Sequence, residues 1–125
     1  MSALEKQVDG NHYKDLAIQP VQFAMANELN FCQASILKYV TRWKSKNGVA
    51  DLKKAAHFAQ LWGELWSPLP PVMDNEITWR EYSFGNELDG WQAEIVYQLC
   101  SPDSARVAGR VACLIRNYIA EVSGE

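Results

Sequence analysis

The stretch "SILKYVTRWKSKNGVADLKKA", residues 35–55, predicts two helices joined by a tight turn. Apolar side chains recur every three or four residues before the turn, as on one face of an α-helix. With Asn30 as a helix N-cap, we expect the first helix to run from residue 31 to about 46. Asn47 and Gly48 are a usual helix stop signal. A further helix is expected from about 49 to 66, so the sequence predicts a helical hairpin over about 31–66.

The flanking segments predict a mainly α fold. Pro20 suits the first residue of a helix to about Leu29, and two further helices are expected over 88–100 and 105–122. The segment "EITWREYSF", residues 76–84, alternates in a way that favours a short strand or an extended arm. Residues 1–19 have no sustained period and are expected to form an irregular arm. No internal repeat is evident.

Three prolines in "SPLPP", residues 67–71, predict a linker or a rigid bend. The expected organisation is therefore a helical region over 1–66, the proline-rich segment 67–71 and a mostly helical region over 72–125. A chain of 125 residues suits one modest domain, so the two regions can also pack together as one.

Composition argues against several protein classes. No apolar run approaches the roughly 18 residues of a membrane span, and the N-terminus lacks the order of a signal peptide. The three cysteines are scattered, which indicates neither a disulfide framework nor a zinc site. We therefore expect an intracellular protein without a metal site.

Charge is distributed unevenly along the chain. Residues 1–66 carry eight Lys or Arg against six Asp or Glu, whereas residues 67–125 carry four against nine, within a net charge of −3. A protein that binds nucleic acid without sequence preference is more often basic overall. The local excess of positive charge favours a small anion instead.

The positive charge is concentrated in the hairpin. Lys38, Arg42 and Lys46 are spaced four residues apart and would share one helix face. The turn at Gly48 would place the first backbone N–H groups of the next helix beside Lys53 and Lys54, a combination that binds phosphate or carboxylate groups. The same lysines can equally be the solvated surface of an ordinary capped hairpin, and both interpretations stay open.

Four motifs, in this order and spacing, carry a resemblance to a known family: "HYK" at 12–14, "IQPVQF" at 18–23, "ILKYVTRWKSKNG" at 36–48 and "DLKKA" at 51–55. They resemble the SaV-like family of small tailed-bacteriophage proteins over residues 11 to about 66. The resemblance implies a phage-encoded protein in the host cytoplasm with a nucleotide-related role, since the family is related to an unusual nucleotide kinase without a P-loop. Ala34 and Ser35 stand where the family usually has Gly-Asn.

The resemblance also implies a set of ligand-binding residues. An arginine would contact phosphate in a bidentate manner, and a histidine or tyrosine of the arm would stack on or hydrogen-bond a base. Together with Lys46 of the basic stripe, the candidates are His12, Tyr13, Lys38, Tyr39, Arg42, Lys46, Gly48, Asp51 and Lys54.

Three functions are compatible with these observations. The first is a phage accessory protein that binds a nucleotide or nucleotide-derived anion and sequesters a host defence signal. The second is a nucleoside monophosphate kinase, which would need Mg²⁺ although the sequence has no P-loop and indicates no catalytic residue. The third is a protein-interaction module that acts on a host protein through the aromatic and acidic second half. A two-helix hairpin rarely closes its own core, so we also expect a homo-oligomer.

Overall fold

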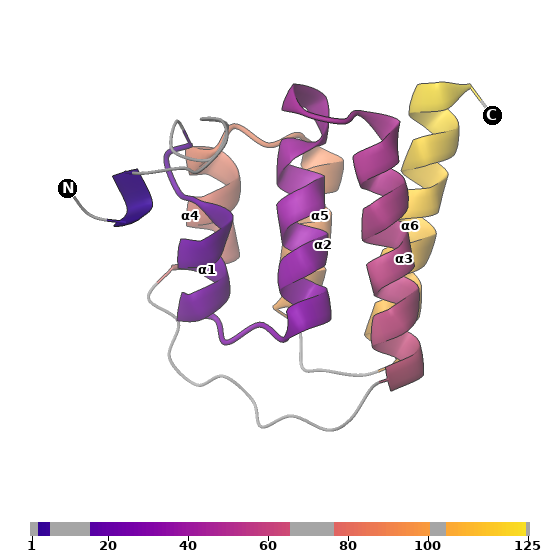
Figure 1. Cartoon of the computed structure of the whole chain (residues 1–125), viewed down its shortest axis with the longest axis horizontal. Helices are drawn as coiled ribbons and strands as arrows, with labels where there is room; N and C mark the ends of the chain where they lie inside the picture. Colours follow the sequence, from indigo (N-terminus) through magenta and orange to yellow (C-terminus); the bar gives the residue numbers. More distant parts are fainter. Residues whose placement is uncertain (1–2, 6–15, 66–76, 101–104, 125) are drawn as a thin grey trace.

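The computed structural model describes residues 3–5, 16–65, 77–100 and 105–124 (Figure 1). Within these ranges the chain is mainly helical and has no strand, which confirms the predicted fold class. The α-helices are α1 (Pro20–Ala26), α2 (Phe31–Arg42), α3 (Val49–Leu65), α4 (Trp79–Gly85), α5 (Gly90–Leu99) and α6 (Ala105–Ser123). Two short 3-10 helices are η1 (Ala3–Glu5) and η2 (Trp43–Ser45). No helix among the described residues combines the length and apolar character that a membrane span requires.

The predicted hairpin is present as α2 and α3, but its first helix ends earlier than expected. The chain tightens into η2 directly after Arg42, and the Gly48 N–H donates to the Trp43 carbonyl at 2.7 Å. Gly48 has a φ of 60°, the left-handed conformation that glycine adopts without steric strain. Lys46 therefore lies beyond α2, and the stripe of cations on that helix ends at Arg42.

The strand or extended arm predicted over 76–84 is wrong in its described part. From Trp79 the chain forms α4, and the Thr78 hydroxyl caps this helix by accepting the Glu81 N–H at 3.1 Å. Tyr82 and Ser83 face inward, three and four residues after Trp79, which is helical spacing. The alternation of apolar residues in so short a window concealed this period. The predicted bend at 67–71 lies outside the described residues, as does most of the arm predicted over 1–19.

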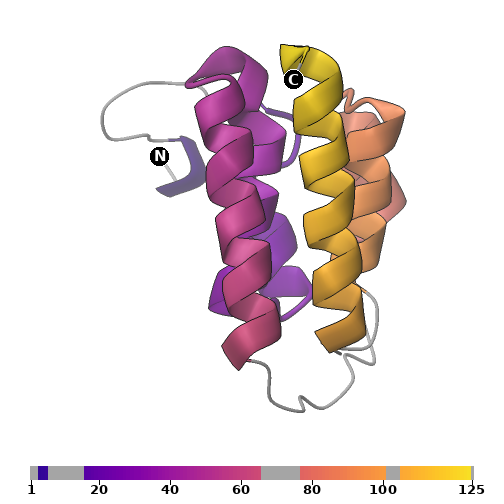
Figure 2. The same ribbon diagram turned by 90° about the vertical axis from the view of Figure 1, so that its right-hand side faces the viewer.

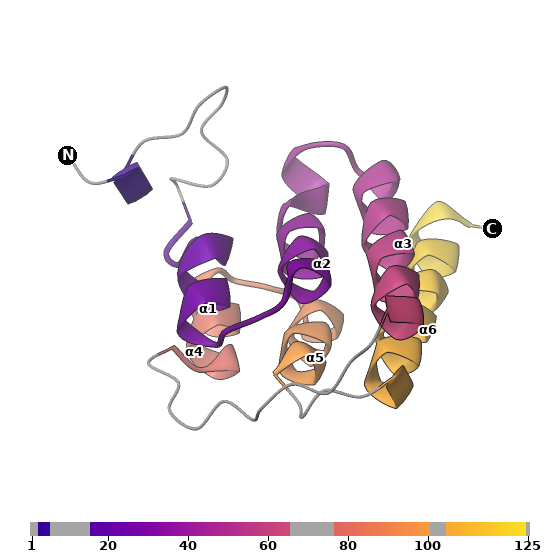
Figure 3. The ribbon, with the colours of Figure 1, turned by 60° about the horizontal axis from the view of Figure 1, so that its bottom comes forward.

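The helices pack in two layers of three. Figure 3 shows α1, α2 and α3 in one layer and α4, α5 and α6 in the other, with α1 next to α4 and α2 next to α5. Figure 2 shows α3 and α6 side by side. The Phe23 and Tyr82 rings meet between α1 and α4 with their centroids 4.8 Å apart. Helices of both halves of the sequence thus contribute to one buried core, which includes Ile36, Leu37, Val40, Leu52, Trp62, Tyr82, Ile95, Leu99, Val111 and Ile115.

The two layers repeat each other in sequence. We name α1–α3 unit 1 and α4–α6 unit 2. The segment "NELNFCQASILKYV" at 27–40 in unit 1 corresponds to "NELDGWQAEIVYQL" at 86–99 in unit 2, with each residue matched 59 positions later. The expectation that the chain has no internal repeat is therefore wrong.

The repeated segments have the same local structure. Glu28 and Glu87 both have positive φ, at 51° and 54°, in the turn before the second helix of each unit. The next helix in each unit begins with a capping box, in which a Gln side chain three residues after the N-cap bonds back to the N-cap backbone. These features determine the same turn geometry twice.

The two units also exchange equivalent hydrogen bonds. The Gln33 amide donates to the Leu99 carbonyl at 3.1 Å, and the Gln92 amide donates to the Val40 carbonyl at 2.9 Å. In the same way, the Asn27 amide donates to the Ile77 carbonyl, and the Asn86 amide donates to the Ile18 carbonyl. Reciprocal contacts of this kind are the property of an interface with two-fold symmetry. Units 1 and 2 are thus related by an approximate two-fold rotation.

The repeat changes the reasoning about a second chain. The expectation of a homo-oligomer followed from a hairpin that cannot cover its own apolar face. In the structure, unit 2 of the same chain covers that face, with α6 lying along α3 and α5 against α2. The homo-oligomer stays a prediction, but this argument no longer supports it.

Candidate functional site

A buried ion pair fixes the turn of the α2–α3 hairpin. The Asp51 side chain is fully buried and lies 3.2 Å from Arg42 Nε and 3.4 Å from Arg42 Nη2. The same carboxylate accepts hydrogen bonds from the backbone and side-chain nitrogens of Asn47, at 3.4 and 3.2 Å. Both Asp51 carboxylate oxygens therefore accept hydrogen bonds from within the hairpin. Asp51, a predicted ligand residue, positions Arg42 and the turn in this structure.

Three cations surround the ring of Tyr39. Lys38 Nζ lies 4.6 Å from the ring centroid, Arg42 Cζ 4.8 Å and Lys54 Nζ 5.6 Å. The Phe58 ring stacks on the Tyr39 ring with the centroids 6.0 Å apart. We call Lys38, Tyr39, Arg42, Lys54 and Phe58 the basic–aromatic cluster. The structure thus brings together four of the residues that the sequence singled out, from two helices.

Two cations of the cluster have no carboxylate partner in the part of the chain that the structure describes. Arg42 is paired with Asp51, whereas neither Lys38 nor Lys54 has a carboxylate partner within the described ranges. The aromatic ring beneath the ammonium groups attracts them through its negative face, which favours cations at this place. The arrangement presents two ammonium groups to an anion from solvent.

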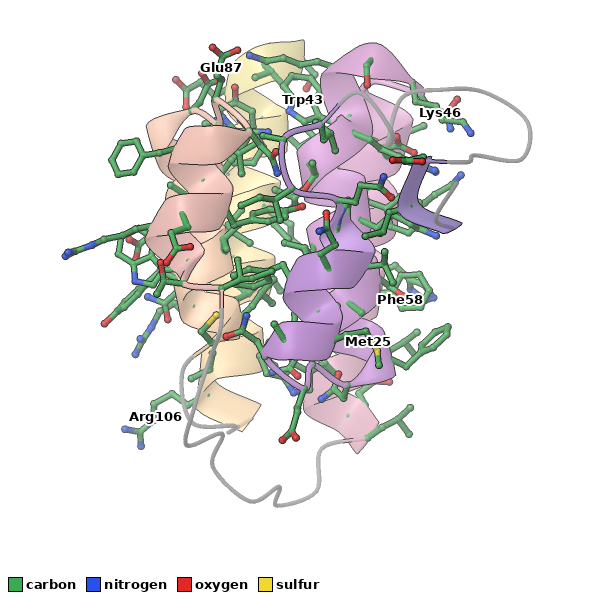
Figure 4. All side chains as sticks on the ribbon, turned by 90° about the vertical axis from the view of Figure 1, so that its left-hand side faces the viewer. Met25, Trp43, Lys46, Phe58, Glu87 and Arg106 are labelled. Carbon is green, nitrogen blue, oxygen red and sulfur yellow. The ribbon has the colours of Figure 1, made fainter. Side chains whose placement is uncertain are left out.

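A groove between α1 and α2 adjoins the cluster. It has a volume of about 320 Å³ and includes Pro20, Val21, Ala24, Met25, Leu29, Phe31, Ala34, Ser35 and Lys38 in its lining. The Met25 and Phe31 side chains are about three-quarters exposed, at 75% and 76%. Figure 4 shows Met25 and Phe58 projecting from the same side of the molecule. Lys38 belongs to both the groove and the cluster, so the two features form one continuous surface.

The other predicted site residues lie elsewhere. His12 and Tyr13 are outside the described residues. Lys46 is exposed, and Figure 4 shows it on the same side as Phe58, nearer the turn end of the hairpin. Gly48 forms the turn between α2 and α3. Among the described residues, the structure thus brings Lys38, Tyr39, Arg42 and Lys54 together.

Lys44, in η2 at the turn end of the hairpin, is directed to unit 2. Its ammonium donates to the Asp89 carboxylate at 2.8 Å in an exposed ion pair. This hydrogen bond and the attraction to Asp89 raise the pKa of Lys44 above its ordinary value. The described residues contain no group of three or more His, Cys, Asp and Glu side chains that could hold a metal ion.

Phe31, Phe58 and Met25 are residues that sequence reasoning missed. Phe31 and Phe58 lie with their ring centroids 5.8 Å apart, which connects the wall of the groove to the stacked ring of Tyr39. A signal was available for Phe58, because it follows Lys54 by four residues and so shares its face of α3. Phe31 joins the cluster through the packing of α2 on α3, and Met25 comes near it through the packing of α1 on α2.

The internal repeat shows that the fold does not require the cluster. The residues of unit 2 that correspond to Phe31, Lys38 and Tyr39 are Gly90, Tyr97 and Gln98. Unit 2 forms the same helices and the same caps without these aromatic and cationic side chains. The cluster is therefore a feature of unit 1 that unit 2 does not have at the corresponding positions.

Comparison with known proteins gives one match. Residues 8–60 match a family described as a protein of unknown function, DUF3310. No curated protein and no solved structure matches the chain. The matched range covers α1, α2 and most of α3, so all residues of the basic–aromatic cluster and the groove lie within the part of the chain that is similar to this family.

Proposed function

We propose that this protein binds a nucleotide or a nucleotide-derived anion on the surface formed by α1, α2 and the first half of α3. One observation carries the proposal: Lys38 lines an apolar groove and also stands over the Tyr39 ring beside Lys54. A nucleotide has the matching composition, because it joins a planar ring to a phosphate group.

The two lysines supply the charge that a phosphate needs. Ammonium groups bind phosphate oxygens through short, charge-assisted hydrogen bonds. Arg42 is held by the buried Asp51 carboxylate and contributes positive potential from a fixed position. The cluster therefore attracts an anion with groups that the hairpin already holds in place.

The arrangement supports binding more directly than phosphoryl transfer. A kinase needs a group that orients the attacking hydroxyl and a cation clamp that usually includes a carboxylate-bound Mg²⁺. The carboxylate of the cluster, Asp51, is buried and accepts hydrogen bonds from Arg42 and Asn47. We therefore favour sequestration of the ligand. If this chain is phage-encoded, as its resemblance to SaV-like phage proteins implies, the sequestered molecule would be a host defence signal.

The test is calorimetric titration with a panel of ribo- and deoxyribonucleotides and cyclic nucleotides. The double variant Lys38→Gln/Lys54→Gln is expected to weaken the best ligand by at least about tenfold, because it removes two charged hydrogen-bond donors. Lys53→Gln is the control. It removes one lysine charge from the residue next to Lys54 in α3, whose side chain lines a different cavity with Arg116 and Ile119 of α6. Its affinity should equal that of the unaltered protein.

Two results would refute the proposal. One is a panel in which no nucleotide binds, and the other is equal weakening by the double variant and by Lys53→Gln. The phosphotransferase alternative is examined with the same protein, ATP, Mg²⁺ and each deoxynucleoside monophosphate. If the unaltered protein forms a diphosphate product and the double variant does not, the protein is a phosphotransferase and the sequestration proposal is wrong.

A further inference from the structure

Unit 2 holds an aromatic pair at the positions that correspond to the groove of unit 1. Trp79 on α4 and Tyr97 on α5 lie edge to face, with their ring centroids 5.2 Å apart. By the repeat, these residues correspond to Pro20 and Lys38, which line the groove between α1 and α2. The same pair of helices is thus bridged by aromatic rings in one unit and separated by a volume of about 320 Å³ in the other.

We propose that the groove between α1 and α2 is the subsite for the planar base of the nucleotide, in the place where unit 2 has its own Trp79 ring. This inference rests on the proposed function and adds which part of the ligand the groove holds. The base takes the groove, and the phosphate of the same molecule takes Lys38 and Lys54.

The walls of the groove suit a flat ring. Val21, Met25 and Phe31 are apolar and highly exposed, at 53%, 75% and 76%, and exposed apolar side chains that adjoin one another mark a binding surface. Phe31 offers an aromatic face, and the flexible thioether of Met25 adapts to a ring edge. A volume of about 320 Å³ is at the lower end of ligand pockets, which fits one ring system and not a larger molecule.

The distances allow one molecule to reach both parts of the surface. Lys38 lines the groove, and its ammonium lies 4.6 Å from the Tyr39 centroid, from which the Lys54 ammonium lies 5.6 Å. Phe31 lines the groove and lies 5.8 Å from Phe58, which stacks on Tyr39. A base between α1 and α2 therefore has its sugar and phosphate beside the two lysines.

Unit 2 differs from unit 1 at the positions of both features. Where unit 1 has the small ring of Pro20 and the cation of Lys38, unit 2 has Trp79 and Tyr97, and its Arg80 lies 5.3 Å from the Trp79 centroid. A nucleotide uses an apolar space beside a cation, and in unit 2 two aromatic side chains stand at the positions of Pro20 and Lys38. This paired difference favours a ligand that needs the two at once.

The experiment compares a nucleotide with ribose 5-phosphate, which has the same sugar and phosphate but no base. Binding is followed by ¹H–¹⁵N NMR titration of the full chain, which measures weak as well as tight affinities. Ala34→Leu puts a larger side chain into the groove, and Ala93→Leu makes the same change at the corresponding position of unit 2. Phe31→Ala removes the exposed ring, with Phe84→Ala, 80% exposed in unit 2, as its control.

We expect Ala34→Leu and Phe31→Ala each to weaken the nucleotide by about tenfold, as loss of one stacked base does, and to leave ribose 5-phosphate unchanged. The controls in unit 2 should have no effect on either ligand. Phe31→Ala keeps the test decisive if Ala34→Leu fails to fold, because the removed ring is on the surface.

The outcomes separate the two proposals. If Lys38→Gln/Lys54→Gln weakens the nucleotide but the groove variants do not, the base subsite is wrong and the proposed function stands. If the groove variants weaken ribose 5-phosphate as much as the nucleotide, the groove acts only through the shape of the phosphate site, and the base subsite is again wrong. If neither ligand binds the unaltered chain, both proposals fail.

Discussion

Replacing Asp51 with alanine is expected to lower the free energy of unfolding by about 3–5 kcal/mol. The Asp51 carboxylate is fully buried and accepts four hydrogen bonds, two from Arg42 and two from Asn47. The substitution leaves the Arg42 guanidinium, of which 11% of the side chain is exposed, without this carboxylate in a poorly solvated place. A surface ion pair would contribute less than about 1 kcal/mol, so burial decides the magnitude.

A double variant separates the stability effect of the Arg42–Asp51 ion pair from the effects of its two residues. Arg42→Met/Asp51→Leu removes both charges, and replacing a buried ion pair with apolar side chains is often close to neutral. We therefore expect the double variant to recover most of the stability that Asp51→Ala loses. The coupling free energy from the cycle of the unaltered chain, Arg42→Met, Asp51→Leu and the double variant should exceed about 2 kcal/mol.

The assay is urea unfolding followed by tryptophan fluorescence, supported by thermal unfolding. For a chain of this size, a loss of about 3 kcal/mol should lower Tm by about 10 °C. Lys44→Gln is the control, because its ion pair with Asp89 is exposed on both sides and should change Tm little. An Asp51→Ala protein within about 1 kcal/mol of the unaltered chain would refute the reasoning.

Three further predictions follow from the fold. Gly48→Ala should lower stability by about 1 kcal/mol in urea unfolding, because Gly48 has a φ of 60° and an added Cβ meets no atom within 4 Å, so only backbone strain acts. Gln33→Leu and Gln92→Leu should each lower the free energy of unfolding by about 1–2 kcal/mol and by nearly the same amount. If either substitution leaves stability unchanged, the two-fold equivalence is contradicted. Burial raises the pKa of Cys100 to about 12, so at pH 8 a thiol reagent should modify the exposed Cys113 first and Cys100 only in urea. Because this folded pKa lies above the ordinary value of 9.0, the thiol should contribute less to stability as the pH rises above about 9, which Cys100→Ala should abolish in unfolding curves.

The sequence predicted the parts of the fold that depend on local pattern. The helical period and the stop signal at Gly48 were sufficient for the α2–α3 hairpin, since amphipathic spacing and turn residues act within one segment. The early end of α2 could not be read this way, because it depends on Gly48 bonding back to Trp43 and on a carboxylate of the next helix. α4 was missed because a helix of seven residues shows fewer than two turns of its period.

The internal repeat was missed for a different reason. Most of the shared identities fall on turn and capping positions such as Asn27, Glu28 and Gln33. Apart from Ile36, which matches Ile95, the core positions of the second helix keep only their apolar character. Such a repeat becomes evident when the reciprocal hydrogen bonds are seen. Charge spacing predicted Lys38 and Arg42, and the turn at Gly48 predicted Lys54 near them. The groove depends on how α1 packs on α2, which no local pattern specifies.

The reciprocal packing of the two units has a consequence for how the assembly responds to dilution. An association between two separate chains loses stability as the protein concentration falls, because dissociation is favoured by mass action. Here the partners are consecutive parts of one polypeptide, so their encounter is intramolecular. The two-fold interface between units 1 and 2 should therefore persist at any protein concentration. Because units 1 and 2 are different segments of the sequence, substitutions can also remove cations from one unit and leave the other unit unchanged.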